Sequence, residues 1–157
     1  MKIPIVDEYD NIIYYIERSE RKPEEICRTS DLWITDPDGK ILLAKRSPNK
    51  KDYPGLWGPT VSGVVEEGET YESGIIREIE EEIGLKNIKL TSGNKIKYPN
   101  CFSQQFSFIL PSGFNDFKIQ EEEVAEIKWF TVEELKNKLK MNPEDFLSAV
   151  SIKLSSL

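Results

Sequence analysis

Three glutamates in one short segment have the spacing of a metal site. Glu78, Glu81 and Glu82 lie three and four residues apart in REIEEEIGL, residues 77–85. A helix advances by about 100° per residue, so this spacing puts the three carboxylates on one side. Convergent carboxylates suit a hard divalent cation such as Mg²⁺ or Mn²⁺, which prefers oxygen ligands. Glu80 points nearly the opposite way and is expected to be an ordinary solvated charge.

Like charges on one helix face are unfavourable, so the cluster requires an explanation. An exposed pair at i,i+4 destabilises a helix by roughly a few tenths of a kcal/mol, and by more when it is desolvated. The simpler interpretation is an acidic surface neutralised by Arg77 and Lys86. However, Ile75, Ile79 and Ile83 form an apolar stripe beside the glutamates. This stripe predicts that the cluster lies at the margin of the buried face.

The residues before the helix complete a longer pattern. From Gly63 the chain reads GVVEEGETYESGIIREIEEEIGL, which includes Glu69 and ends in the run from Arg77 to Leu85. This segment resembles the Nudix box, and every defining position of the motif matches. The resemblance covers about residues 28–140. It implies the Nudix fold, an α/β/α sandwich with a mixed β-sheet and the loop-helix-loop of the box.

The resemblance also implies roles for residues of the box. The metal-binding carboxylates of the family correspond here to those of Glu78, Glu81 and Glu82. A frequent backbone ligand of the family corresponds to the carbonyl of Gly63. Glu69 and Arg77 match the pair that usually braces the loop against the helix. Family members typically cleave a diphosphate linked to another moiety, using metal ions that polarise phosphorus and activate water. We therefore expect a metal-dependent hydrolase of nucleoside-diphosphate-linked or related organic diphosphates.

Residues outside the box are candidates for further roles. The general base is either a box glutamate or a carboxylate of QEEEVAE, within which we favour Glu122. Arg46 and Lys50 suit phosphate, whereas Tyr53 and Trp57 suit a nucleobase or an isoprenoid chain. These residues also have structural alternatives. Arg46 suits an ion pair, Glu122 suits a solvated charge in a turn, and Tyr53 and Trp57 suit aromatic packing.

The segment GPTVSG before the box leaves other functions open. It is similar to the branch of the family that resembles isopentenyl-diphosphate isomerase, in which a Cys, a Gly and a His are expected. This sequence has Ser62, Gly63 and Val64 instead, and it contains no histidine. We therefore favour hydrolysis over isomerisation. A module that binds a nucleotide or a protein without turnover is a third interpretation, which the complete carboxylate set disfavours.

The hydrophobic pattern predicts one domain with a short addition before it. Residues 3–17 read as a β-hairpin, so we expect an N-terminal β extension and connector over 1–27 and a single Nudix domain over 28–157. The turn DPDGK joins two strands of that domain, and three further strands are expected after the box.

Capping and turn residues delimit the other elements. Thr70 suits the N-cap and Gly84 the C′ position of a helix over about 71–83. The segment 48–63 is rich in Pro, Gly and Lys and predicts a long surface loop. A Pro at a helix start predicts a final helix over about 143–150.

Composition limits the partners and the compartment. The 157 residues carry a formal net charge of −7, which disfavours long nucleic acid and anionic membranes. Cys27 and Cys101 lie far apart without CxxC spacing, so neither zinc nor a disulfide is expected. No apolar run of signal or membrane length is present, which favours the cytoplasm. Members of the family are often dimers, which leaves a homodimer open.

Overall fold

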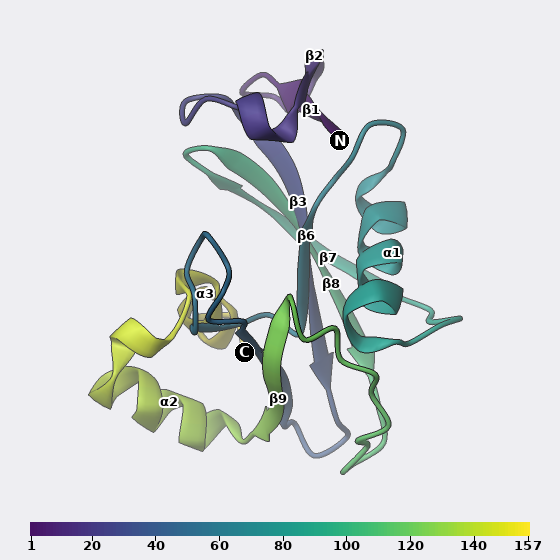
Figure 1. Ribbon diagram of the computed structural model, residues 1–157. Coiled ribbons are helices and arrows are strands. Elements are labelled where there is room, and N and C mark those ends of the chain that lie inside the picture. Colours follow the sequence, from purple (N-terminus) through teal and green to yellow (C-terminus); the bar gives the residue numbers. More distant parts are fainter.

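A seven-stranded mixed sheet forms the centre of the computed structural model, which describes residues 1–157 (Figure 1). Its strands are β3 (Cys27–Thr35), β4 (Ile41–Arg46), β5 (Trp57–Gly58), β6 (Val61–Val64), β7 (Thr91–Tyr98), β8 (Cys101–Ile109) and β9 (Val124–Phe130). Five strands follow the order β5-β4-β3-β8-β7, while β9 pairs with β4 and β6 with β3. Only β3 and β8 run parallel. The predicted mixed sheet is confirmed.

The sheet divides along one edge of β3. Residues 29–32 of β3 pair with β6, whereas only Ile34 and Thr35 pair with β4. The side chain of Thr60 spans the division: its Oγ1 accepts from the backbone N–H of Ile34 at 3.0 Å and donates to the carbonyl of Leu42 at 2.5 Å. These bonds satisfy backbone groups that a continuous ladder would have paired. The division separates β4 from β6 and leaves space between them.

Helices cover both faces of the sheet. Helix α1 (Tyr71–Ile83) lies on one face, and α2 (Val132–Met141) and α3 (Ser148–Ser155) lie on the other (Figure 1). Alternate residues of β3 serve the two layers, since Leu32 packs with the α1 cluster and Trp33 with the α2–α3 cluster. The result is the predicted α/β/α sandwich. None of its helices has the length and apolarity needed to cross a membrane.

The predicted box helix has the predicted ends. Thr70 accepts a hydrogen bond from the backbone N–H of Ser73 at 3.0 Å, and the Ser73 hydroxyl accepts from the N–H of Thr70 at 2.9 Å. This capping box satisfies donors that the first turn leaves free. Gly84 follows the last turn with φ +73°, a left-handed conformation that glycine adopts without steric cost.

The predicted N-terminal hairpin consists of β1 (Lys2–Val6) and β2 (Ile12–Glu17), which pair antiparallel. It leads into a short 3₁₀ helix, η1 (Arg18–Glu20). Ile3 and Ile5 form a small buried cluster with Cys27, the first residue of β3. This cluster packs the hairpin against the sheet.

Two expectations require correction. Residues 48–63 are not one loop, because β5 and most of β6 lie within them. The final helix is not continuous over 143–150: η2 (Pro143–Asp145) ends before Phe146, whose neighbour Leu147 donates from its N–H to the carbonyl of Trp57 in β5. That bond keeps the chain extended until α3 begins.

The two cysteines are distant in the sequence but adjacent in the sheet. Cys27 and Cys101 are register partners in the parallel β3–β8 pair. Both are free thiols. Burial raises the pKa of the Cys101 thiol to about 11 and also raises that of Cys27, so neither is ionised at neutral pH.

Candidate active site

A cavity of about 300 Å³ lies beside the division of the sheet. Its walls include residues 44–46 of β4, residues 61–64 of β6 and four side chains of α1. Those four are Arg77, Glu78, Glu81 and Glu82. Only six of the 23 lining residues are hydrophobic, so the cavity suits a polar or charged ligand.

Glu82 is a buried carboxylate without a partner. The residue is 8% exposed and its side chain makes neither an ion pair nor a hydrogen bond within the protein, while its carboxylate is open to the cavity. Burial raises the pKa of the Glu82 carboxyl to about 8, and the negative charges of Glu78 and Glu123 add to the increase. Burial also raises the pKa of Glu78, although Arg77 opposes that increase. Such a site favours a proton or another cation at Glu82.

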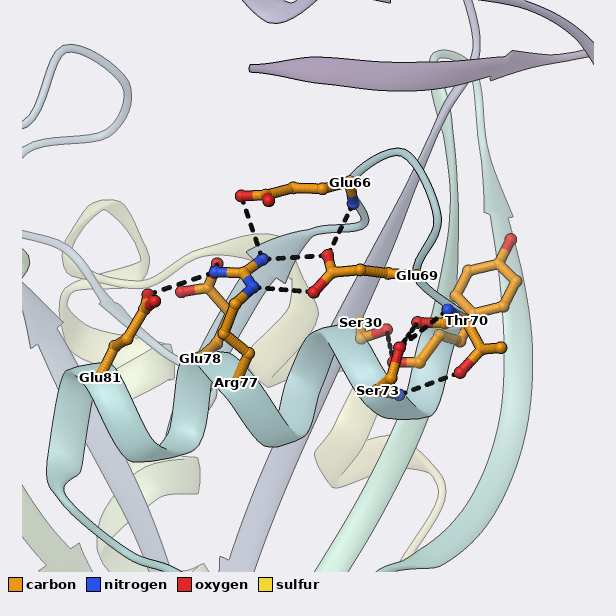
Figure 2. A network of polar contacts seen from close by, with 9 residues as sticks. Ser30, Glu66, Glu69, Thr70, Ser73, Arg77, Glu78 and Glu81 are labelled. Atoms are coloured by element: carbon orange, nitrogen blue, oxygen red, sulfur yellow. Dashed lines mark hydrogen bonds and ion pairs between the residues drawn. The ribbon is translucent and has the colours of Figure 1, made fainter.

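Arg77 joins the helix to the loop that precedes it (Figure 2). Its Nε lies 2.8 Å from Oε2 of Glu69 and its second terminal nitrogen lies 3.1 Å from Oε1, a bidentate pair. Its other contacts reach Glu66 at 3.3 Å, Glu78 at 2.9 Å and Glu81 at 3.2 Å. The Glu69 hydrogen bonds raise the pKa of the Arg77 guanidinium, and they lower the pKa of the Glu69 carboxyl. The geometry is that of the predicted brace.

Gly63 allows β6 to lie close to α1. A Cβ at this position would lie 2.5 Å from Cγ and 2.7 Å from Cδ of Glu78, distances that real Cβ contacts do not reach. Any larger residue would therefore displace the Glu78 carboxylate. The preceding Ser62 also lines the cavity, and its hydroxyl donates at 2.6 Å to the buried Asp31. Burial raises the pKa of Asp31 against the effect of three hydrogen-bond donors.

The donor set of this site fits a hard divalent cation. Glu78 and Glu82 are carboxylates in a poorly solvated setting, and Glu82 forms no ion pair, although the positive charges of Lys50 and Arg46 oppose the increase in its pKa. No three carboxylate or thiol side chains enclose a metal-sized space in this structure. Arg77 instead contacts both Glu78 and Glu81, and Glu81 is half exposed. The oxygen ligands are present, and Arg77 neutralises part of their charge.

The structure brings some of the other predicted residues to the cavity. Arg46 and Lys50 both line it, and Lys50 forms an ion pair with Glu123. Tyr53 is 64% exposed and does not line the cavity, so its substrate contact stays a prediction. Trp57 is also outside it, because its ring packs edge-on against Phe130 at 5.2 Å in the core.

The predicted general base lies one residue away from the cavity. Glu122 is exposed and does not line the cavity, whereas Glu123 does. The N–H of Val124 donates to the carbonyl of Gln120, and this turn directs neighbouring side chains differently. A run of consecutive glutamates contains no signal that selects one of them. As expected, Glu80 is exposed and lies 3.3 Å from Lys86.

A mixed-sheet sandwich with a polar cavity against a glutamate-rich helix suits the binding of a small charged ligand. The NUDIX domain model matches residues 27–149, so the chain belongs to the Nudix family and is a Nudix hydrolase. A prenyl-diphosphate phosphatase of Methanosarcina mazei is 34% identical to it over 92% of this chain and 88% of the relative. An uncharacterised Nudix hydrolase of Yersinia pestis is 28% identical over 98% and 85% of the two chains.

Solved structures agree on the fold. A crystal structure of a Deinococcus radiodurans protein superposes with a TM-score of 0.86, covering 99% of this chain and 98% of that one at 19% identity. A MutT protein of Methanosarcina mazei gives a TM-score of 0.64 over 83% and 91% of the two chains, at 20% identity. Because the first match includes nearly the whole chain, it extends over the N-terminal hairpin as well.

Proposed function

We propose that this protein is a metal-dependent hydrolase that cleaves the diphosphate bond of a small organic substrate. The observation that carries the proposal is Glu82, an unpartnered carboxylate in the wall of a polar cavity. A folded protein keeps such a group at a cost in free energy unless a cation offsets it. Mg²⁺ is the ion that we propose, with Mn²⁺ as the alternative, because both prefer oxygen ligands.

The proposed ligands are Glu78, Glu81, Glu82 and the carbonyl of Gly63. When bound, the ion supplies charge neutralisation at the phosphate and lowers the pKa of the attacking water. Arg46 receives substrate phosphate, since its guanidinium has no carboxylate partner and lines the cavity. Glu123 takes the place we gave to Glu122 as the candidate base, because Glu123 lines the cavity.

The relative from Methanosarcina mazei supports an organic diphosphate as the substrate. Its name is prenyl-diphosphate phosphatase, and it aligns with most of this chain. We infer a substrate whose diphosphate fills the polar cavity while its organic group extends outside, because few lining residues are hydrophobic. Isomerisation remains the alternative of the related branch, but Ser62 stands where that branch has a thiol, and its hydroxyl already donates to Asp31.

A paired substitution tests the proposal. Glu82→Gln removes the buried carboxyl group that would bind the ion, whereas Glu80→Gln removes an exposed charge from the same helix that is paired only with Lys86. Phosphate release would be measured from prenyl diphosphates and nucleoside diphosphate derivatives, with and without Mg²⁺. We expect Mg²⁺-dependent release by the wild type, a loss of about 100-fold or more in kcat for Glu82→Gln, and a change below about twofold for Glu80→Gln.

The opposite results would reject the proposal. They are the absence of metal-dependent release from every substrate, or equal activity of Glu82→Gln and wild type. Deuterium incorporation into isopentenyl diphosphate without phosphate release would instead support isomerisation. Tight nucleotide binding without any product would support a binding module. A homodimer stays a prediction. Light scattering, which measures the molar mass in solution, would test it.

A further inference from the structure

Arg18 is the one arginine of this chain whose guanidinium has no partner in the protein. The other four donate from their guanidinium groups to protein oxygens: Arg21, Arg28, Arg46 and Arg77. Arg18 makes no side-chain hydrogen bond and no ion pair, and it is exposed. An arginine that is not needed for folding contacts remains available to a ligand.

Arg18 lines the same cavity as the box glutamates, although it comes from the N-terminal hairpin. It is the first residue of η1, and its backbone N–H donates to the carbonyl of Met1 at 2.9 Å. At the same end of the hairpin, the N–H of Glu67 donates to the carbonyl of Lys2 at 2.9 Å. Glu67 belongs to the segment that leads into α1. Backbone bonds therefore hold this end of the hairpin at the cavity, while the Arg18 side chain is unengaged.

Two other basic groups of the cavity are engaged by carboxylates: Arg77 is bound to glutamates, and Lys50 is paired with Glu123. Lys45 and Arg46 line the β4 side of the cavity without a carboxylate partner, whereas Arg18 comes from the opposite, N-terminal part of the chain. A diphosphate carries several negative charges, and a cation held at the glutamates neutralises only part of them. A guanidinium offers two parallel N–H donors to phosphate oxygens. Arg18 can supply this contact from the hairpin side of the cavity.

We propose that Arg18 binds a phosphate group of the substrate and is a specificity-determining residue for diphosphates. The residue precedes the family match, which begins at residue 27. The hairpin therefore contributes to the substrate site. This inference rests on the proposed function, because it takes a diphosphate as the ligand of the cavity.

The test compares three variants with the wild type. Arg18→Gln removes the charge, and Arg18→Lys keeps the charge but loses the bidentate geometry. Lys22→Gln is the matched control, because Lys22 is exposed in the same connector and does not line the cavity. Binding of methylenediphosphonate, which cannot be hydrolysed at its P–C–P bridge, would be measured by calorimetry with and without Mg²⁺. KM and kcat for a prenyl diphosphate would be measured in parallel.

We expect Arg18→Gln to raise the Kd for methylenediphosphonate and the KM about tenfold or more, with kcat within about twofold of wild type. Arg18→Lys should recover part of the affinity, and Lys22→Gln should bind as the wild type does. Wild-type affinity in Arg18→Gln would overturn the inference, even if the enzyme turns over its substrate. Weaker binding in Arg18→Gln without turnover of any substrate would support the Arg18 contact and reject the proposed hydrolysis. The melting temperature of each variant shows whether it is folded.

Discussion

The raised pKa of Glu82 predicts that metal binding at this residue releases a proton. With a pKa of about 8 in the metal-free protein, its carboxyl is protonated in about nine of ten molecules at pH 7. A metal ligand must be ionised, so binding of Mg²⁺ should release close to one proton per protein at pH 7 and almost none at pH 9. Calorimetry in two buffers of different ionisation enthalpy measures this release. The affinity for Mg²⁺ should rise by about tenfold over the same pH range.

Two variants locate the proton. Glu82→Gln should abolish the pH-dependent release, whereas Glu80→Gln should leave it unchanged, since Glu80 is exposed and paired with Lys86. Identical heats in the two buffers at pH 7 would contradict a role for Glu82 in binding the ion.

The stability of the metal-free protein should fall with pH, whereas the affinity for Mg²⁺ rises. Because the folded-state pKa is raised, the free energy of unfolding falls as pH rises from about 4.5 to 8.

At the scale of residues, the sequence predicts chemistry better than environment. Helical spacing alone placed Glu78, Glu81 and Glu82 on one side, and all three line the cavity. The spacing does not predict that Glu82 is buried and unpartnered while Glu81 is half exposed. Exposure depends on the strands that pack beside α1. Arg18 was missed altogether, since no motif includes it and only the folded hairpin brings it to the cavity.

At the scale of elements, the close approach of β6 to α1 makes Gly63 sensitive to substitution. Gly63→Ala would place a methyl group 2.5 Å from Cγ of Glu78, so the carboxylate must move. We expect the affinity for Mg²⁺ to fall by about tenfold and stability to fall by about 1–3 kcal/mol from overpacking. Calorimetric titration with Mg²⁺ and urea unfolding measure the two effects.

Gly74→Ala is the control for this substitution. Gly74 lies within α1, and a Cβ there would meet Glu69 Oε1 at 3.4 Å, an ordinary contact. Replacing a helical glycine by alanine should raise stability by about 0.5–1 kcal/mol and leave the affinity for Mg²⁺ unchanged. If Gly63→Ala bound Mg²⁺ as tightly as Gly74→Ala, the position of Glu78 would not matter for the ion.

Local signals explain which elements were predictable. Helix α1 was predicted with its bounds because Thr70 and Gly84 cap it through their own side chain and backbone conformation. The short strands β5 and β6 were not predicted, since Pro and Gly dominate their segment and their pairing partners are β4 and β3. The extended chain before α3 has the same origin, because its hydrogen bond goes to Trp57 in β5. Pairing between distant segments has no local pattern.

At the scale of the whole molecule, one aspartate joins the hairpin to three elements of the domain. Asp10 lies in the hairpin turn, and its carboxylate accepts from Arg28 of β3 at 2.7 Å, Lys95 of β7 at 2.6 Å and Tyr71 of α1 at 2.9 Å. The sequence predicted the hairpin but not these contacts. They join residues 18, 61 and 85 positions apart in the chain.

The lowered pKa of Asp10 also predicts how the stability of the protein changes at low pH. Its burial raises the pKa, but the hydrogen bonds from Lys95 and Arg28 outweigh burial, so the pKa of Asp10 lies below its usual value. A lowered folded-state pKa means that this contribution to stability is present above about pH 4 and is lost as pH falls through the folded-state pKa. Asp10→Asn keeps the left-handed turn, at φ +66°, which Asn tolerates. It should destabilise the protein by about 1–3 kcal/mol at pH 7 and by less at pH 3, where the unfolded-state carboxyl is already mostly protonated.

Urea unfolding at both pH values measures the difference, and hydrogen exchange of the β1–β2 amides shows whether the hairpin loosens first. Glu8→Gln is the control, because Glu8 is exposed in the same turn and makes no ion pair or side-chain hydrogen bond. An equal loss of stability in Asp10→Asn at pH 3 and pH 7 would show that the charge of Asp10 does not hold the hairpin. A loss confined to neutral pH, with faster exchange in β1 and β2, would show that the carboxylate fixes the segment that carries Arg18. Asp10→Asn should then also weaken binding of methylenediphosphonate, although Asp10 does not line the cavity.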